Sequence, residues 1–308
     1  MRTGGIVSIG ECMLELSGLG GDTWRMGFAG DTLNTLWTLR ALSPEDQPVD
    51  YVTAFGDDPF SARQLSFFRE NGIGIARSPT IPEARPGLYA ITLEGAERSF
   101  TYWRSDSAAR QLAGDPDALR GSLRDQALVY FSGITLAILD VPARRTLLQA
   151  VEHVRAAGSL VAFDPNYRPR LWSGQEEARA AMAGALAVTD IALPTSPDEQ
   201  MLHGDASAHQ TAQRMREAGL AEIVVKNGAE PALVASKGLL AAVEAVHVEN
   251  PVDTTGAGDA FNGAYLAARL AGHGPAEAAR RAHRVAAAVV QVRGALAPFE
   301  VLREAFGG

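Results

Sequence analysis

Short apolar runs alternate with amphipathic stretches along most of the chain. Apolar runs of four or five residues predict buried strands, and amphipathic stretches that stop at glycine predict helices. This order of segments is typical of a doubly wound α/β fold with a mostly parallel sheet flanked by helices. The predicted strands cover residues 6–9, 51–55, 127–131, 160–163, 190–193 and 222–225, and the predicted helices cover 59–71, 142–157, 257–270 and 275–292.

Two segments do not follow this alternation of short apolar runs and amphipathic stretches. Residues 88–93 and 98–103 are rich in aromatic and β-branched side chains and are separated by a short turn at 94–96, which predicts a β-hairpin. The glycine-rich residues 14–28 are expected to join it. We therefore expect one domain over residues 1–308, with a small β-sheet lid formed by roughly 12–29 and 86–105.

Bulk composition narrows the class of protein. The 308 residues are 46% hydrophobic and 21% charged, as in ordinary globular proteins, and the net charge of −8 disfavours nucleic-acid binding. The chain has no apolar run as long as a membrane span and no signal-peptide pattern. Cys12 is the only cysteine, which suits a reducing compartment and is read as a small buried side chain. The expected location is the cytoplasm, without membrane contact.

The glycine turn before the helix predicted at 257–270 is the strongest chemical signal. The first amides of a helix lack internal partners and the dipole is positive there, so an anion can bind them. Gly256 and Gly258 leave the backbone open to such an anion. Asp259 lies one turn inside. One interpretation is a general base that takes a proton from an attacking hydroxyl; the other is an acidic residue that only favours the helix dipole.

Two further groups of polar residues carry competing interpretations. Asp164, Asn166 and Arg168 follow a predicted buried strand, where open α/β sheets bind ligands. They are interpreted either as ligands of phosphate, metal and an oxyanion, or as an Asx turn with a surface arginine. Tyr102 and Arg104 share one face of the hairpin by the two-residue period of a strand. An aromatic ring can pack against a carbon skeleton, and an arginine can bind a carboxylate. The alternative is that Arg104 is a solvated arginine at the end of a strand.

The sequence Asp253-Thr-Thr-Gly-Ala-Gly-Asp-Ala-Phe261 resembles the C-terminal signature of the ribokinase-like (PfkB) carbohydrate kinases, and residues 29–34 resemble their N-terminal signature. Ala29 replaces a glycine that is usual in the family. The resemblance implies a ribokinase-like fold and in-line phosphoryl transfer from ATP with Mg²⁺, with a monovalent cation as an open question. It makes Asp259 the base and the amides of Gly256, Ala257 and Gly258 the groups that stabilise the γ-phosphate. The sequence contains no GxxxxGK[ST] phosphate loop.

Residues 87–89, 96–104 and 164–172 resemble the 2-keto-3-deoxygluconate kinase branch of this family, whose substrate carries a carboxylate. The resemblance implies that the sugar acid is held by Gly30, Asn34, Tyr89, Tyr102, Arg104 and Arg168. It implies that the nucleotide is bordered by Asp164, Asn166, Ser196, Lys226, Gly228, Gly256 and Gly258, with adenine near Ala287 and Gln291. Glu199 is expected near Mg²⁺ without binding it directly. Ser196 and Pro231 depart from the family pattern, in which Asn and Gly are usual.

The expected reaction is ATP-dependent phosphorylation of 2-keto-3-deoxygluconate to its 6-phosphate. The alternatives are a kinase of fructose, ribose or a related keto-deoxy acid, and a sensor that binds a sugar acid without turning it over. Exposed lid strands favour pairing with a second copy, so a homo-oligomer assembled through the lid is expected.

Overall fold

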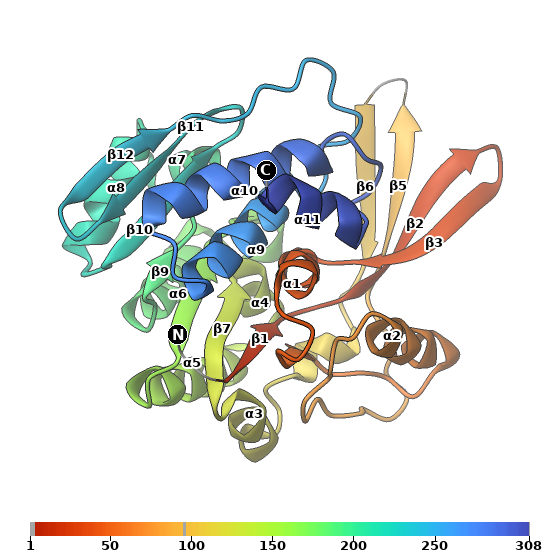
Figure 1. Ribbon diagram of the computed structural model, residues 1–308. Coiled ribbons are helices and arrows are strands. Elements are labelled where there is room, and N and C mark those ends of the chain that lie inside the picture. Colours follow the sequence, from red (N-terminus) through yellow and green to blue (C-terminus); the bar gives the residue numbers. More distant parts are fainter. Residues whose placement is uncertain (1–3, 95–96, 308) are drawn as a thin grey trace.

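The computed structural model describes residues 4–94 and 97–307, and within them the strands form two separate sheets (Figure 1). The larger sheet has the order β12-β11-β10-β9-β8-β7-β1-β4. Its strands run parallel from β10 to β4, whereas β11 and β12 are antiparallel additions at one edge. The strands of this sheet are β1 (Gly5–Ile9), β4 (Val49–Val52), β7 (Gln126–Ser132), β8 (Leu160–Asp164), β9 (Ile191–Ala192), β10 (Glu222–Asn227), β11 (Glu230–Ser236) and β12 (Leu239–Val243).

Helices cover both faces of the larger sheet because its central strands are apolar on both sides. Consecutive residues of β1 show this: Ile6 packs into the core on one face and Val7 into the core on the other. The first face is covered by α1 (Asp31–Leu42), α2 (Pro59–Glu70), α9 (Ala257–Leu270), α10 (Pro275–Val289) and α11 (Phe299–Gly307). The second is covered by α3 (Pro116–Leu123), α4 (Gly133–Ile138), α5 (Val141–Ala156), α6 (Gln175–Ala187), α7 (Ser196–His203) and α8 (Ala208–Glu217).

The smaller sheet is formed by the two segments that were expected to make a lid, and it stands away from the main body in Figure 1. We call this sheet the lid. It consists of β2 (Met13–Gly20), β3 (Thr23–Ala29), β5 (Leu88–Glu94) and β6 (Glu97–Trp103) in the order β3-β2-β5-β6. The β5–β6 pair is the predicted hairpin, with Tyr89 opposite Tyr102. The turn expected at 94–96 falls mostly on residues 95–96, which lie outside the described residues. The glycine-rich segment joins the lid as predicted.

Element positions agree with the sequence prediction in most places and differ at some ends. The helix predicted at 257–270 is α9 with identical bounds. The strand predicted at 51–55 was wrong at its end, because β4 stops at Val52. The helix predicted at 275–292 was too long: α10 ends at Val289. The chain turns there because the amides of Val252 and Asp253 both donate to the Val290 carbonyl, at 2.8 and 3.1 Å.

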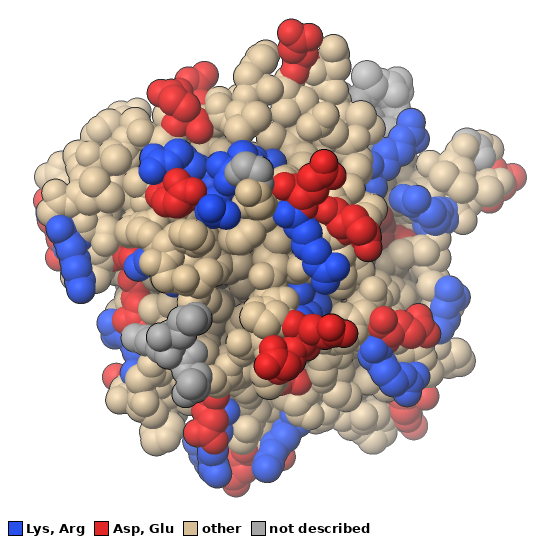
Figure 2. Space-filling model, in the orientation of Figure 1, with Lys and Arg blue, Asp and Glu red and all other residues tan. Residues whose placement is uncertain are grey.

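Among the helices of the described residues, none combines the length and apolar character that a membrane-spanning helix needs. On the face shown in Figure 2, basic and acidic side chains are interspersed over α10 and α11. Ion pairs such as Arg281–Glu277, at 3.1 Å, account for part of this mixing.

Candidate active site

The turn before α9 is held in place by Asp253. Its Oδ1 accepts from the Thr255 amide at 2.9 Å, and its Oδ2 accepts from the Gly294 amide at 2.8 Å. Gly256 caps α9 at φ 75°, in the left-handed region that favours glycine. A Cβ at this position would lie 2.8 Å from the Ala295 Cβ. The amino end of α9 is therefore fixed and bare, as an anion-binding helix terminus requires.

Asp259 lies in the first turn of α9, and its half-buried carboxylate faces the amino end of α1. The Asn34 Nδ2 donates to the Asp259 Oδ2 at 2.8 Å, and the Asn34 Oδ1 accepts from the Gly30 amide at 3.4 Å. Burial, and then the nearby Asp31 carboxylate, raise the pKa of Asp259 to about 7. A carboxylate with this pKa is matched to accepting a proton near neutral pH.

The acid limb of kcat/KM is therefore expected near pH 7. Below this pH the Asp259 carboxyl is protonated and cannot accept a proton, so activity falls as pH drops through about 7. Asp31→Asn removes a negative charge that raises the pKa of Asp259 and should move the limb to lower pH. Asp117→Asn, a change in the exposed first turn of α3, is the control and should leave the limb in place. Identical profiles for all three proteins would contradict this assignment.

A buried hydrogen-bond network lies behind the turn. The Lys226 Nζ donates to the Asp164 Oδ2 at 2.6 Å and to the Asn262 Oδ1 at 2.9 Å. The Asn262 Nδ2 donates to the same Asp164 oxygen at 2.6 Å. The Lys226 Nζ also lies 3.9 Å from the place of a Cβ at Gly258. The network thus ties the ends of β8 and β10 to α9 and places a cation beside the bare turn.

A cavity of about 920 Å³ opens between the lid and the amino ends of α1 and α9. It brings together all six residues that the sequence assigned to the sugar: Gly30, Asn34, Tyr89, Tyr102, Arg104 and Arg168. Asp259 and Gly256 line the same cavity. The rings of Tyr89 and Tyr102 lie 5.6 Å apart on the inner face of the lid. We call this space the sugar cavity, after the ligand that the resemblance implies for these residues.

Three arginines line the sugar cavity: Arg104, Arg168 and Arg170. Two of them have carboxylate partners, because Arg104 pairs with Glu11 and the Arg168 Nη1 lies 3.0 Å from the Asp198 Oδ2. The cavity is therefore less positive than three free arginines would make it. A guanidinium has five N–H donors, so each arginine keeps donors for a ligand after it binds its partner.

Asn166 and Asp164, which were expected beside the nucleotide, make their side-chain contacts elsewhere. The Asn166 Nδ2 donates to the Asp31 Oδ2 at 2.9 Å. Asn166 and Asp31 both line the sugar cavity. Asp164 is 2% exposed and is satisfied by Lys226 and Asn262. Neither side chain therefore faces the second cavity described next. The Asn166 backbone amide donates to the Asp164 Oδ1 at 3.0 Å, which is the Asx turn considered as the alternative.

A second cavity of about 430 Å³ lies on the other side of the glycine turn. Of the residues expected at the nucleotide, Lys226, Gly228, Gly258 and Ala287 line it, whereas Ser196 and Gln291 do not. The Gln291 side chain instead donates to the Ala287 carbonyl at 2.9 Å. The two cavities meet at the turn, since Thr255 and Gly256 line the first and Ala257 and Gly258 line the second.

Glu199 is buried in an ion-pair cluster outside both cavities. The Arg214 Nη2 lies 2.6 Å from the Glu199 Oε2 and 2.7 Å from the Asp205 Oδ2. Burial raises the pKa of Glu199 to about 7 in spite of the arginine. In the part of the chain that the structure describes, no three His, Cys, Asp or Glu side chains are grouped for a metal ion. A metal there would depend on phosphates and water for most of its ligands.

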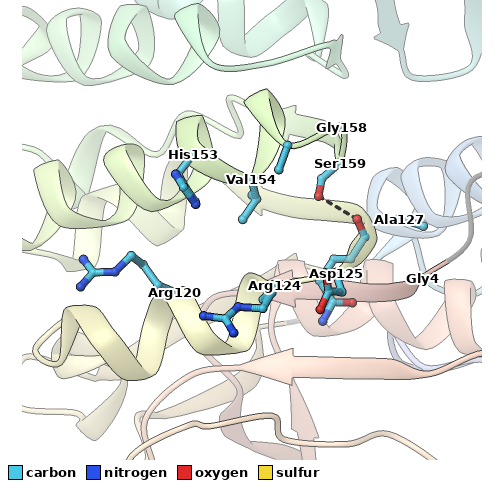
Figure 3. A pocket seen from close by; sticks show the side chains of 11 residues that line it. Gly4, Arg120, Arg124, Asp125, Ala127, His153, Val154, Gly158 and Ser159 are labelled. Atoms are coloured by element: carbon cyan, nitrogen blue, oxygen red, sulfur yellow. Dashed lines mark hydrogen bonds between the residues drawn. The ribbon is translucent and has the colours of Figure 1, made fainter.

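A third cavity, of about 860 Å³, lies at the opposite ends of the parallel strands, where β7 and β8 begin (Figure 3). Arg120, Arg124 and His153 surround it, and all three are exposed. It is bordered by the carboxyl ends of α3 and α5, whose dipoles disfavour anions. The sugar cavity and its neighbour at the glycine turn are therefore the candidate active site.

Sequence reasoning missed several residues of this site. Glu11 lines the sugar cavity from the segment between β1 and β2, Met13 from the start of β2, and Asp31 from inside the N-terminal motif. Thr195 and His283 line the second cavity. Asp31 could have been predicted from the sequence, because it stands between Gly30 and Asn34, which were both assigned to the sugar. The others needed the three-dimensional arrangement.

The chain matches the family described as pfkB family carbohydrate kinase over residues 4–302. It is 43% identical to a 2-dehydro-3-deoxygluconokinase of Dickeya dadantii, over 98% of this chain and 99% of that protein. A 2-dehydro-3-deoxygluconokinase of Escherichia coli is 41% identical over 96% of this chain and 98% of that protein. The crystal structure of a PfkB protein from Polaromonas sp. JS666 is 26% identical and superposes with a TM-score of 0.84, over 97% of this chain and 99% of that one. The chain therefore belongs to the pfkB family of carbohydrate kinases.

Proposed function

We propose that the protein transfers the γ-phosphoryl group of ATP to the 6-hydroxyl of 2-keto-3-deoxygluconate, also called 2-dehydro-3-deoxygluconate. The observation that carries this proposal is full-length similarity, at 43% and 41% identity, to two kinases named for that substrate. The sugar cavity supports it, because three arginines and a candidate base line one space. A sugar acid offers a carboxylate to the arginines and a terminal hydroxyl to the base.

The transfer is assigned to the place where the two cavities meet. Asp259 takes the proton of the 6-hydroxyl as this oxygen attacks the γ-phosphorus. The new oxygen–phosphorus bond forms in line with the bond that breaks, and ADP leaves with the electron pair. The amides at the amino end of α9 stabilise the charge that develops on the phosphoryl oxygens. Mg²⁺, when bound with ATP, supplies further neutralisation of the phosphate charge.

Residues of the second cavity are assigned to ATP. Lys226, with its ammonium next to Gly258, places a positive charge beside the phosphates. Gly228 and Ala287 border the remaining space, and Phe261 and His283 supply flat side chains that suit a purine ring. Asp164 is assigned a supporting role, because it holds Lys226 and does not reach the cavity.

Arg104→Ala is expected to raise KM for the keto acid by about 10- to 100-fold, because a charge-assisted hydrogen bond to the substrate is lost. KM for ATP should change by less than about twofold, since Arg104 does not line the second cavity. Steady-state kinetics of ADP release measures both constants. Arg120→Ala, at the third cavity, is the control. Equal losses on the keto acid and on fructose would contradict the assignment of Arg104 to the carboxylate.

The lid is proposed to pair with the lid of a second copy. β3 and β6 are the edge strands of the small sheet, and Trp24 and Trp103 are 42% and 57% exposed. Unpaired edges and exposed aromatic side chains favour association. The molecular mass in solution, measured by light scattering, decides between a monomer and an oligomer.

Formation of ADP from ATP in the presence of Mg²⁺ and the keto acid tests the proposal. Steady release of ADP that depends on the sugar acid is expected. Binding of the sugar acid without ADP release would instead favour the sensor considered above. The intact turn with Asp259 and the bare amino end of α9 supports the kinase.

A further inference from the structure

Glu11 lies where four segments cross between the main body and the lid. It follows β1 and precedes β2, so it belongs to the first crossing segment. Its backbone carbonyl packs against Gly30 in the second, where an added Cβ would lie 2.1 Å from that oxygen. Its Oε1 packs against Gly87 in the third, where an added Cβ would lie 2.6 Å away. Its Oε2 accepts from Arg104 in the fourth.

The ion pair between Glu11 and Arg104 is buried, and it leaves some polar atoms of both side chains without hydrogen bonds. The Glu11 side chain is 1% exposed and that of Arg104 is 11% exposed. Among residues 4–94 and 97–307, the Glu11 Oε1 and the Arg104 Nε are buried without a hydrogen-bond partner. Within the described residues, Glu11 is the acidic partner found for Arg104. One carboxylate therefore sets the direction of a guanidinium that lines the sugar cavity.

Orientation, more than stability, is the expected role of such a pair. Two charges taken from water lose much of their attraction to desolvation, so a buried ion pair contributes little net stability. A guanidinium is planar with its donors in a rigid fork, so fixing one Nη also fixes where the other donors point. Glycine at positions 30 and 87 leaves the room that Glu11 occupies. The surrounding backbone therefore holds Glu11 in one place, and Glu11 holds the guanidinium of Arg104.

We propose that Glu11 is the positioning residue for Arg104 and thereby sets the affinity of the sugar cavity for the substrate carboxylate. This rests on the proposed function, since it assumes that Arg104 binds a sugar acid. The second arginine provides an internal comparison. Arg168 pairs with Asp198 at 3.0 Å, but its side chain is 50% exposed. The Asp198 side chain is 16% exposed, so water reaches this pair more than it reaches Glu11 and Arg104. Screening by water weakens an ion pair, so Asp198 holds Arg168 less firmly than Glu11 holds Arg104.

The test compares variants by steady-state kinetics with the keto acid. Glu11→Leu should raise KM for the keto acid about tenfold, because Arg104 is no longer directed at the substrate. The kcat and KM for ATP should stay within about twofold. Glu11→Gln should recover most of the affinity, since its amide oxygen still accepts from the arginine. Asp198→Leu should change KM by less than about threefold.

A double-mutant cycle separates positioning from a general structural effect. In an Arg104→Leu background, Glu11→Leu should cause no further rise in KM, because the arginine it acts through is absent. The Leu–Leu variant replaces both buried charges together, so it is expected to fold even if Glu11→Leu alone does not. Independent, multiplying effects on KM would overturn the proposal, and so would a Glu11→Gln variant as impaired as Glu11→Leu.

A ligand-free crystal structure distinguishes failure of this inference from failure of the proposed function. In the Glu11→Leu variant the guanidinium of Arg104 should leave the position it has in the unmodified protein. An unmoved guanidinium would overturn the positioning role, whatever the substrate is. If the unmodified protein does not phosphorylate the keto acid but the guanidinium moves, the substrate assignment fails and the positioning role stands.

Discussion

Asp259→Asn is expected to lower kcat by about 10²-fold or more, with little change in either KM. Asparagine keeps the size of the side chain but cannot accept the proton of the attacking hydroxyl. The Asn34 Nδ2 donates to the Asp259 Oδ2, and this contact keeps a hydrogen-bonding partner in the variant. The site should therefore still bind both substrates. Rapid-quench and steady-state assays of ADP formation measure the effect.

Thermal melting shows whether the lower kcat of Asp259→Asn comes from unfolding of the variant. The pKa of Asp259 is raised to about 7, so the folded state disfavours the carboxylate relative to the unfolded chain. Its contribution to stability is lost as pH rises from the usual carboxyl range through about 7. The Asp259→Asn variant, which carries no charge there, should melt no lower than the unmodified protein at pH 8. A kcat that stays unchanged in a folded variant would remove Asp259 as the base.

Gly256→Ala is expected to reduce kcat by about 10²-fold, the scale of losing one anion-stabilising amide. The new Cβ would lie 2.8 Å from the Ala295 Cβ and 3.0 Å from its Cα, so the turn must shift. Alanine is also strained at φ 75°, which costs about 1–2 kcal/mol. Both effects act on the amides that face the phosphate. KM for ATP should rise together with the loss in kcat.

Gly272→Ala is the matched control for that variant. Gly272 has φ 92° and lies just after α9, but a Cβ there would meet no atom of the residues that the structure describes within 4 Å. It therefore reports the backbone strain alone, and it lies at the other end of the same helix. We expect it to lower the free energy of unfolding by about 1–2 kcal/mol and to leave kcat unchanged. Equal kcat losses in the two variants would mean that strain, and not the anion site, explains the first.

The parts of the fold that follow from local patterns were predictable. The strand run at 6–9 and the helix at 257–270 have a clear apolar spacing, and both elements form where expected. The pairing of β2 with β5 has no local signal, because it joins residues about 75 positions apart. The end of β4 at Val52 is set by such a contact as well, since Phe55 bridges to Thr80 from another segment.

The residues of the candidate site also fall into two groups: those that one local motif predicts, and those that only the fold brings together. Asp259 and Gly256 lie in one short motif, so their proximity follows from the sequence alone. The partners of the arginines cannot be predicted in this way. Glu11 and Arg104 are 93 positions apart, so only the folded chain brings them together. The charge argument from two arginines was incomplete for this reason. Each guanidinium has a carboxylate partner that the apolar pattern does not reveal.

The expectation that Glu199 lies near Mg²⁺ stays a prediction. It came from the motif that spans Ser196 to Glu199, and the motif did not reveal that the carboxylate is buried against Arg214 and lines neither cavity. Burial depends on how α7 packs against α8, which the local sequence does not specify. Asn262 is the opposite case: it is fully buried at 0% exposure and looked like an ordinary helix residue, but it joins Lys226 to Asp164.

A competition between two substrates tests the central claim most directly. Equal concentrations of 2-keto-3-deoxygluconate and fructose are incubated with the protein, ATP and Mg²⁺, and the phosphorylated products are quantified by mass spectrometry. Their ratio equals the ratio of the two kcat/KM values. The account predicts that the sugar-acid 6-phosphate exceeds fructose phosphate by at least about 10²-fold, because only the acid engages Arg104 and Arg168. Comparable amounts of the two products, or an excess of fructose phosphate, would contradict it.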